Sequence, residues 1–191
     1  MTAATLAYVR ERLPIALVAI VVAALDAAAF ALAGVRPTPW SMASLSAVAA
    51  LLFAQYRLWD DLEDRERDRA SHPDRVTVRH ARSAFVPALV IAGAAALVVP
   101  AWLGARAATI AIASLDAAFW IAYSHIRPRI GDRAWRFAIL LLKYPAFVTV
   151  LAAMCGPVSP WRAAIAAIVV YAGAVTYEAL HDRRPAMGAA S

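Results

Sequence analysis

The sequence has very little of the chemistry on which secreted proteins and many metalloproteins depend. A single cysteine, Cys155, excludes an internal disulfide and a cluster of cysteine ligands for a metal. No cleavable signal peptide is expected, because the first apolar run is long enough to span a bilayer and no convincing cleavage site follows it. No repeat relates the two halves at the level of motifs, which argues against the architecture of many transporters.

Apolar residues are abundant instead. The 191 residues are 63% hydrophobic, with a mean hydropathy of +0.63, whereas soluble domains are about half apolar. We therefore expect an all-α, polytopic membrane bundle that forms one domain over residues 1–191. Six stretches are long enough to cross a hydrocarbon core of ~30 Å as helices. These predicted spans are 13–34, 38–59, 84–104, 106–125, 134–154 and 161–181.

The positions of the basic residues predict how the bundle is oriented. Fifteen of them fall in the termini and in two connections on one side of the predicted spans, whereas the other side has only Arg36, Arg106 and Arg162. The positive-inside rule places both termini and the polar loop 60–83 in the cytoplasm, as in a protein of a bacterial-type inner membrane. The net charge of +6 does not indicate a nucleic-acid partner, because the arginines alternate along the chain with apolar spans.

A block of charge follows the second predicted span, where residues 57–68 read R-L-W-D-D-L-E-D-R-E-R-D. A continuous helix would place Arg57, Asp61, Asp64 and Asp68 on one face, Asp60 a quarter-turn aside, and Glu63 and Glu66 pointing away. Stacked carboxylates repel one another unless a cation binds them, and hard oxygen ligands suit Mg²⁺. The alternative is a solvated helix end, since Arg65, Arg67 and Arg69 are interleaved with the acids.

Four ionisable residues lie within or at the edge of the predicted spans, namely Asp26, Asp116, Lys143 and Glu178. Each is costly in hydrocarbon, so we expect it to face the bundle interior. Asp26 is expected to pair or to hydrogen-bond with a neighbouring helix. Asp116 shares a helical face with Tyr123 and Arg127, and Tyr171, Glu178 and Asp182 line one stripe of the last span. The carboxylate pair Glu178 and Asp182 repeats the chemistry of the acidic block on the same side of the membrane.

The acidic block resembles a motif of the UbiA superfamily of intramembrane prenyltransferases. Residues Asp60 to Asp68 have the spacing of the family's N-D-x-x-D-x-x-x-D, with Asp60 in place of the leading asparagine. The segment His72-Pro73-Asp74-Arg75 is similar to the one that follows this motif, and Tyr123-Ser124 with Arg127 resembles the loop after the family's fourth helix. Glu178 and Asp182 lie where the second acidic motif belongs. The chain departs from the family in having six spans rather than eight or nine, in Val76 at a position that is often proline, and in the register of the second motif.

This resemblance implies that an isoprenoid diphosphate is the substrate, that a lipophilic acceptor receives the isoprenoid, and that Mg²⁺ is the cofactor. It implies three groups of site residues. Asp60, Asp61, Asp64, Asp68, Glu178 and Asp182 would hold the metal; Arg57, Arg75, Tyr171 and Lys143 would contact the substrate; Asp116, Tyr123 and Arg127 would be catalytic. Tyr123, Trp120, Phe119 or Tyr171 would offer aromatic faces to an allylic cation.

The same resemblance predicts that the two acidic segments meet around the diphosphate. The face of Asp61, Asp64 and Asp68 would turn toward Glu178 and Asp182, with a cavity beneath that Asp116 and Tyr123 line, and Lys143 would face the bundle. Two other interpretations remain open. One is a catalytically silent relative that binds lipid or a partner protein, and the other is a transporter of protons or a small cation that uses Asp26, Asp116 and Lys143.

Overall fold

The structure, a computed structural model, describes residues 2–130 and 138–181, and for residues 177–181 it describes the backbone alone. Within these ranges the chain forms helices and no β-strand. The α-helices are α1 (Ala3–Arg12), α2 (Ile15–Ala33), α3 (Pro39–Glu63), α4 (Arg65–Ser71), α5 (Val76–Arg79), α6 (Val86–Trp102), α7 (Arg106–Ile121), α9 (Lys143–Cys155) and α10 (Pro160–His181). Shorter turns are the 3-10 segments η1 (Arg82–Ala84) and η3 (Arg127–Arg129) and the π-helical segment η2 (Ala122–Ile126).

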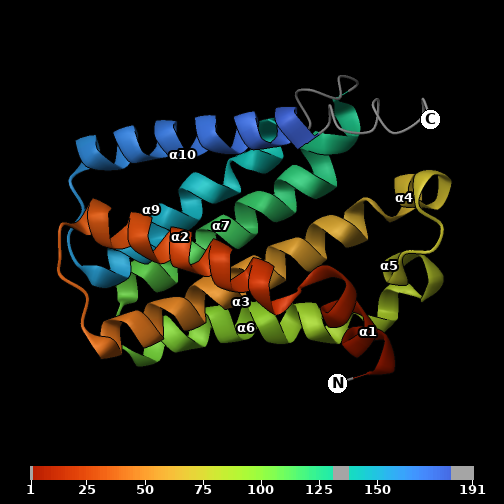
Figure 1. Cartoon of the computed structure of the whole chain (residues 1–191), viewed down its shortest axis with the longest axis horizontal. Helices are drawn as coiled ribbons and strands as arrows, with labels where there is room; N and C mark the ends of the chain where they lie inside the picture. The colour runs from red at the N-terminus through yellow and green to blue at the C-terminus, as the bar shows by residue number, and fades with distance from the viewer. Residues whose placement is uncertain (1, 131–137, 182–191) are drawn as a thin grey trace.

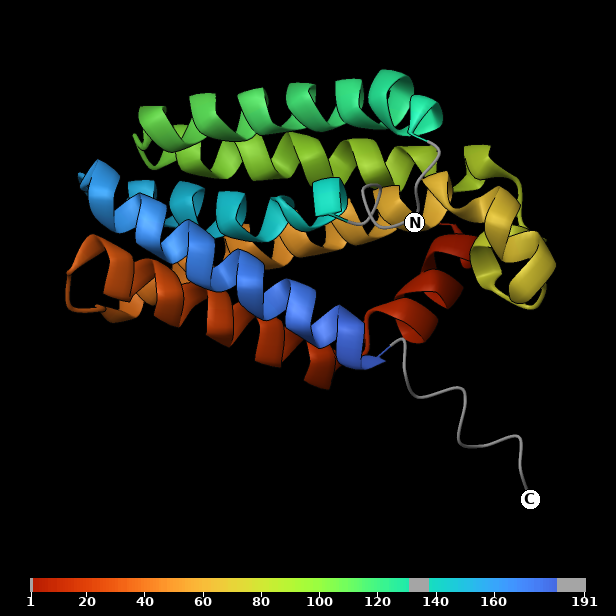
Figure 2. The ribbon, with the colours of Figure 1, turned by 90° about the horizontal axis from the view of Figure 1, so that it is seen from above.

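The long helices form a bundle, and α1, α4 and α5 form a cap at one end of it (Figure 1). Figure 2 shows α2 and α10 along one side of the bundle, α6 and α7 along the opposite side, and α3 and α9 between them. The helix positions predicted from the sequence are confirmed wherever the structure describes them. The predicted span 134–154 begins in residues outside the described ranges, and its described helix runs over Ala138–Cys155.

In the part of the chain that the structure describes, three helical segments are long and apolar enough to cross a membrane, namely Ile15–Ala33, Arg106–Arg129 and Ala138–Cys155. Two shorter apolar helices, Val86–Trp102 and Pro160–Thr176, lie beside them. Large apolar side chains such as Ile20, Ile91 and Ile168 are exposed on the outer surface of the bundle. A surface of this kind is suited to contact with lipid rather than with water.

Small residues allow the helices to pack closely in the core. Ala29, Ala49, Ala96, Ala108 and Ala152 are fully buried at the points where the long helices meet. Larger core residues fill the remaining space between them, among them Leu45, Leu52, Tyr56, Ile112 and Leu151. Close approach of backbones gives the dispersion contacts that hold transmembrane helices together.

The cap is organised by helix α1, which the sequence had not indicated as a separate element. Thr2 caps it by accepting a hydrogen bond from the backbone N–H of Thr5 at 3.1 Å. A second apolar cluster, made of Ala4, Tyr8, Leu58, Leu62, Val76 and Phe85, fixes α1 against the end of α3 and against α5. The N-terminal helix is thereby brought beside the acidic block.

The acidic block is not one continuous helix. Helix α3 ends at Glu63, helix α4 begins at Arg65, and Asp64 between them has φ −85° and ψ −3°. Arg65 turns back to donate hydrogen bonds to the carbonyls of Thr77 and His80, at 2.8 and 2.9 Å. These contacts tie α4 to the loop around α5.

Candidate functional site

Five side chains from distant parts of the chain converge between the helices at the cap end, and we call them the interhelical cluster: Asp60, Asp64, Tyr123, Arg127 and Lys143. The Asp60 carboxylate accepts hydrogen bonds from the Tyr123 hydroxyl and from the Lys143 ammonium group. The Asp64 carboxylate accepts one from the Arg127 guanidinium. Lys143 and Tyr123 are buried. Acids of α3 are therefore joined to η2, η3 and α9.

The helical repeat aligns these partners. Asp60 and Asp64 lie four residues apart on α3, and Tyr123 and Arg127 lie four residues apart on η2 and η3. The π-helical segment η2 lies at this point, as π-bulges frequently do at functional sites. The Arg127 guanidinium also lies over the Tyr123 ring, 5.8 Å from its centroid. The predicted shared face of Asp116, Tyr123 and Arg127 is confirmed, since all three contact α3.

Asp116 lies deeper in the bundle than the interhelical cluster. Its Oδ1 accepts hydrogen bonds from Gln55 Nε2 at 2.9 Å and from the Tyr56 hydroxyl at 2.8 Å. Gly93 of α6 makes room for the Gln55 amide, because a Cβ at that glycine would lie 3.1 Å from Gln55 Nε2. Asp116 thus fixes the position of Tyr56, a contact that the pattern of charges in the sequence did not indicate.

The two remaining aspartates of the motif, Asp61 and Asp68, belong to a second group, the cap cluster, and each of them is 5% exposed. Asp61 is 5% exposed and accepts hydrogen bonds from the Tyr8 hydroxyl at 2.9 Å and from Arg12 Nε and Nη2 at 3.0 and 2.8 Å. Arg57 Nε lies 3.7 Å from the same carboxylate. Burial alone would raise the pKa of Asp61, but the hydrogen bond from Arg12 and the charges of Arg57 and Arg12 outweigh it and hold this pKa below its usual range.

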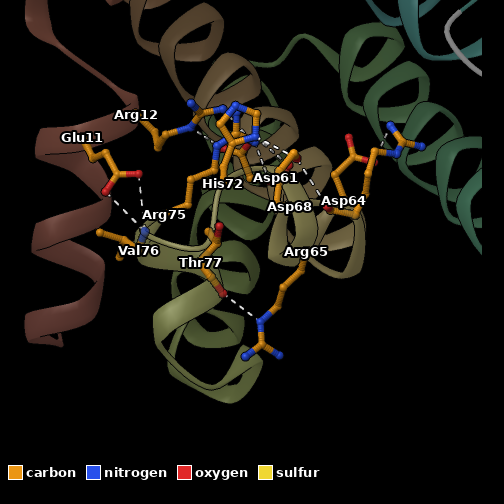
Figure 3. Close-up of polar contacts among 12 residues, drawn as sticks. Glu11, Arg12, Asp61, Asp64, Arg65, Asp68, His72, Arg75, Val76 and Thr77 are labelled. Atoms are coloured by element: carbon orange, nitrogen blue, oxygen red, sulfur yellow. Dashed lines mark hydrogen bonds and ion pairs between the residues drawn. The ribbon is translucent and has the colours of Figure 1, made fainter.

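Asp68 completes the cap cluster. Its carboxylate accepts a hydrogen bond from Arg75 Nη1 at 2.5 Å, and the His72 ring lies 3.9 Å away. Figure 3 shows Asp61 and Asp68 on the side of Arg12 and Arg75, with Asp64 turned the other way. The prediction of one face shared by Asp61, Asp64 and Asp68 is therefore wrong, because Asp64 turns toward Arg127 whereas Asp61 and Asp68 turn toward Arg12 and Arg75. Asp60, predicted to lie to one side of that face, is the carboxylate that belongs with Asp64 to the interhelical cluster.

An apolar cavity of about 520 Å³ lies between α2, α3, α9 and α10. Its walls include Leu25, Val148 and Val170, and among the described residues that line it Arg57 is the only charged one. A much smaller space of about 10 Å³ lies beside it, and its lining residues are Phe53, Tyr56, Arg57, Asp60, Lys143, Tyr144 and Phe147. The small space shares residues with both the cavity and the interhelical cluster, so it lies next to both. Asp116 and Tyr123, predicted to open into a cavity, line neither space.

Aromatic rings lie around the small space beside the interhelical cluster and the cavity. The Tyr56 ring packs against Phe119 at 5.1 Å and Phe147 at 5.0 Å between centroids, and Trp59 packs against Tyr123 at 5.2 Å. Of the predicted aromatic walls, Phe119 and Tyr123 belong to this group. Trp120 is 57% exposed on the outer surface, and the Tyr171 hydroxyl donates a hydrogen bond to the Ala138 carbonyl at 3.2 Å. Tyr56 lies one turn before Asp60 on α3, a spacing that could have indicated it.

Several other predictions concern charged residues within the predicted spans. Lys143 faces the bundle, as predicted, since it is 7% exposed and contacts Asp60. Asp26 accepts a hydrogen bond from Ser46 of the neighbouring helix at 2.5 Å, which confirms the expected interhelical bond. The side chain of Glu178 and the whole of Asp182 lie outside the described residues. The end of α10 lies at the same end of the bundle as the cap (Figures 1 and 2).

The carboxylates differ in their suitability for a divalent cation. Among the described residues, no group of three or more histidine, cysteine or acidic side chains lies close enough together to enclose a metal. Mg²⁺, however, usually takes one or two carboxylates and completes its shell with water and substrate phosphates. Asp60 and Asp64 fit this mode, because both offer hard oxygens on the same side of α3. Asp61 and Asp68 are held by Arg12 and Arg75 on the other side.

Comparisons of the chain with protein families, with curated proteins and with solved structures found no match. The acidic motif and the geometry of the residues around it are therefore the features of this chain that bear on its function. The decisive geometric feature is that a partly buried cluster of opposite charges lies beside an apolar cavity of ligand size.

Proposed function

We propose that this chain is an intramembrane prenyltransferase of the UbiA type, which moves an isoprenoid chain from its diphosphate to a lipophilic acceptor. In this proposal six helices span a bacterial-type cytoplasmic membrane, and the cap and both termini lie on the cytoplasmic side. The single observation that carries the proposal is that the interhelical cluster adjoins the apolar cavity. An amphiphile with a charged head and a long apolar tail has the shape and polarity that this pair of spaces requires.

The cavity would take the isoprenoid tail. Its volume of about 520 Å³ lies within the range of about 300–1,000 Å³ that is typical of small-molecule sites. Apolar walls favour hydrocarbon, at about 0.8 kcal/mol for each buried methylene. Gly173 of α10 also lines the cavity, and a Cβ at this residue would meet nothing within 4 Å, so the wall at α10 leaves space for a ligand.

The diphosphate would lie at the interhelical cluster. Lys143 and Arg127 are cationic donors there, and hydrogen bonds from such groups to phosphate oxygens are short and strong. Arg57 lines both the small space and the large cavity, so it could contact the diphosphate from the cavity side. Burial between helices lowers the effective dielectric constant and strengthens each of these interactions.

The chemistry would take place beside the aromatic rings. The bond between the allylic carbon and the diphosphate oxygen breaks, and its electron pair leaves with the diphosphate. The nucleophilic atom of the acceptor forms the new bond, and its proton passes to the released diphosphate. The rings of Tyr56 and Phe147, which line the small space, offer electron-rich faces to the positive carbon. Asp116 holds Tyr56 in place through its hydroxyl. Mg²⁺ bound at Asp60 and Asp64 would supply Lewis-acid neutralisation of the charge on the leaving diphosphate.

One observation favours a second candidate, a relative that binds an isoprenoid or another lipid without turning it over. All four aspartates of the motif already have cationic partners within the chain.

The transport interpretation has no comparable support. Asp26 contacts Ser46, Asp116 contacts Gln55 and Tyr56, and Lys143 contacts Asp60, so these groups do not bond to one another as a relay would require.

Metal-dependent turnover of a radiolabelled prenyl diphosphate in membranes that contain the chain tests this proposal. Asp64→Asn removes a carboxylate of the interhelical cluster and should lower turnover by about 10²-fold or more, as losses of charge stabilisation at an active site commonly do. The matched control is Glu66→Gln, two residues further on, whose side chain is 76% exposed and pairs with Arg69. This variant should retain full turnover.

Equal loss in the two variants would contradict the assignment of the site. Binding of the prenyl diphosphate by the wild-type chain with no turnover at any Mg²⁺ concentration would favour the lipid-binding relative instead. Reading the product by mass spectrometry of the lipid extract would identify the acceptor.

A further inference from the structure

We propose that Lys143 and Arg127 act as a lock on the interhelical cluster, so that the site takes no divalent cation until a diphosphate has drawn these two cations away from Asp60 and Asp64. The inference rests on the proposed function, and it concerns the order in which the ligands of that site bind. It is carried by the ion pairs that close the cluster in the ligand-free chain.

Both oxygens of Asp60 are engaged by groups from other segments, and so is Oδ1 of Asp64. Asp60 accepts hydrogen bonds from Lys143 and Tyr123 through its two oxygens, and Asp64 accepts one from Arg127. Arg67 Nη1 also lies near Asp64, at 3.4 Å from Oδ1. A metal ion cannot bind Asp60, or Oδ1 of Asp64, at its normal coordination distances until the hydrogen-bond donor on that oxygen has moved away.

The balance of charge gives the order of binding. Within the described residues, the two carboxylates of the cluster face its two cations, and Arg67, 44% exposed, adds a third cation beside Asp64, so this part of the ligand-free site carries a net positive charge. A divalent cation on its own would add to this charge in a partly buried place, where repulsion is strong. A diphosphate on its own is attracted, and by pairing with Lys143 and Arg127 it releases the carboxylates. The metal then binds between carboxylate and phosphate oxygens, in the manner that Mg²⁺ prefers.

The position of Lys143 suits such an exchange. It lies at the start of α9, and its side chain lines the small space that lies next to the cluster and the cavity. The ammonium group sits on a flexible stem, so it can turn from Asp60 to a phosphate without movement of the helix. Linkage makes the coupling reciprocal, so the diphosphate strengthens metal binding by the same factor as the metal strengthens diphosphate binding.

Two binding measurements on purified chain in lipid nanodiscs test the lock without turnover. The first follows Mn²⁺ alone by electron paramagnetic resonance, and the second follows a non-hydrolysable prenyl diphosphate analogue alone in the presence of EDTA. The variant Lys143→Gln removes the charge but keeps a hydrogen-bond donor beside Asp60. We expect it to bind Mn²⁺ about tenfold or more tightly than the wild type and the analogue about tenfold or more weakly, within the range of couplings between linked sites.

The second variant, Arg127→Gln, should move both affinities in the same directions as Lys143→Gln. The control Arg82→Met removes the cation that pairs with Glu63 at 2.5 Å, outside the cluster, and should leave both affinities unchanged. Opposite shifts of the two affinities distinguish a lock from a merely structural ion pair, whose loss would weaken both. The lock is overturned if wild-type chain binds Mn²⁺ as tightly as the variants, or if both affinities fall together. If the wild-type chain does not bind the analogue, the proposed function itself is overturned.

Discussion

Replacing Arg12 with methionine should make helix α1 open from the bundle more often, because Arg12 is the main ionic partner of Asp61. Arg12 donates two hydrogen bonds to a carboxylate that is only 5% exposed. Removing one partner of a buried ion pair typically costs about 3–5 kcal/mol. Here the Arg12 side chain is 20% exposed, and Tyr8 and Arg57 remain beside Asp61, so we expect about 2 kcal/mol.

Hydrogen exchange of the α1 amides, read by mass spectrometry in nanodiscs, measures this local opening directly. A change of 2 kcal/mol should lower their protection about thirtyfold. The matched control is Arg10→Met on the same helix, because Arg10 is exposed and has no ion pair within the described part of the chain. Its protection should match the wild type.

The double variant of Arg12→Met with Asp61→Asn isolates the pair. Asp61→Asn alone should cost about 1 kcal/mol, since Tyr8 can still donate to the amide oxygen and Arg12 is partly hydrated. The double variant should be little worse than Arg12→Met, which gives a coupling energy on the order of 1 kcal/mol. Additive costs, or equal loss of protection in Arg10→Met, would refute the reasoning.

Three further predictions concern pH, chain length and topology. The pKa of Asp61 is lower in the folded chain than in the unfolded chain, so the stability that its charged form gives to the packing of α1 is complete above the unfolded pKa of about 3.9 and is lost as pH falls through the folded pKa. Pepsin should therefore release α1 only below about pH 4. Gly173→Leu places a side chain in the cavity, and turnover of long prenyl diphosphates should fall about tenfold relative to short ones, as kcat/KM for the two lengths will report. Reporter fusions should place residues 60–83 in the cytoplasm and the connections at Arg36 and Arg106 outside, and an outward loop 60–83 would contradict the shared face on which the site depends.

The positions of the long helices could be predicted because they depend on local properties. Apolar runs of about 20 residues and the charges at their ends are read directly from the sequence, and the predicted span 13–34 became the helix Ile15–Ala33. The face shared by Asp116, Tyr123 and Arg127 could be predicted for the same reason, since helical spacing survives even through the π-helical turn. The burial of Lys143 followed from the cost of an unpaired charge in hydrocarbon.

The division of the acidic motif into two clusters could not be predicted. The break at Asp64 contains neither glycine nor proline, and it depends on bonds from Arg65 to carbonyls more than ten residues away. The partners of Asp61 depend on a short helix that lies 49 residues earlier and folds back onto the end of α3. Long-range contacts of this kind leave no periodic signal, and so Asp60 rather than Asp61 emerged as the companion of Asp64.

The central claim is that one amphiphilic ligand places its head at the interhelical cluster and its tail in the apolar cavity. A prenyl diphosphate with a photoreactive diazirine at the end of its tail tests this most directly, through cross-linking in nanodiscs followed by digestion and mass spectrometry. The account predicts labels on cavity residues of α2, α9 and α10, such as Leu25, Val148 and Val170, and their loss in excess unlabelled prenyl diphosphate. Labels confined to the outer surface of α6 and α7, or labels that excess ligand does not displace, would contradict it.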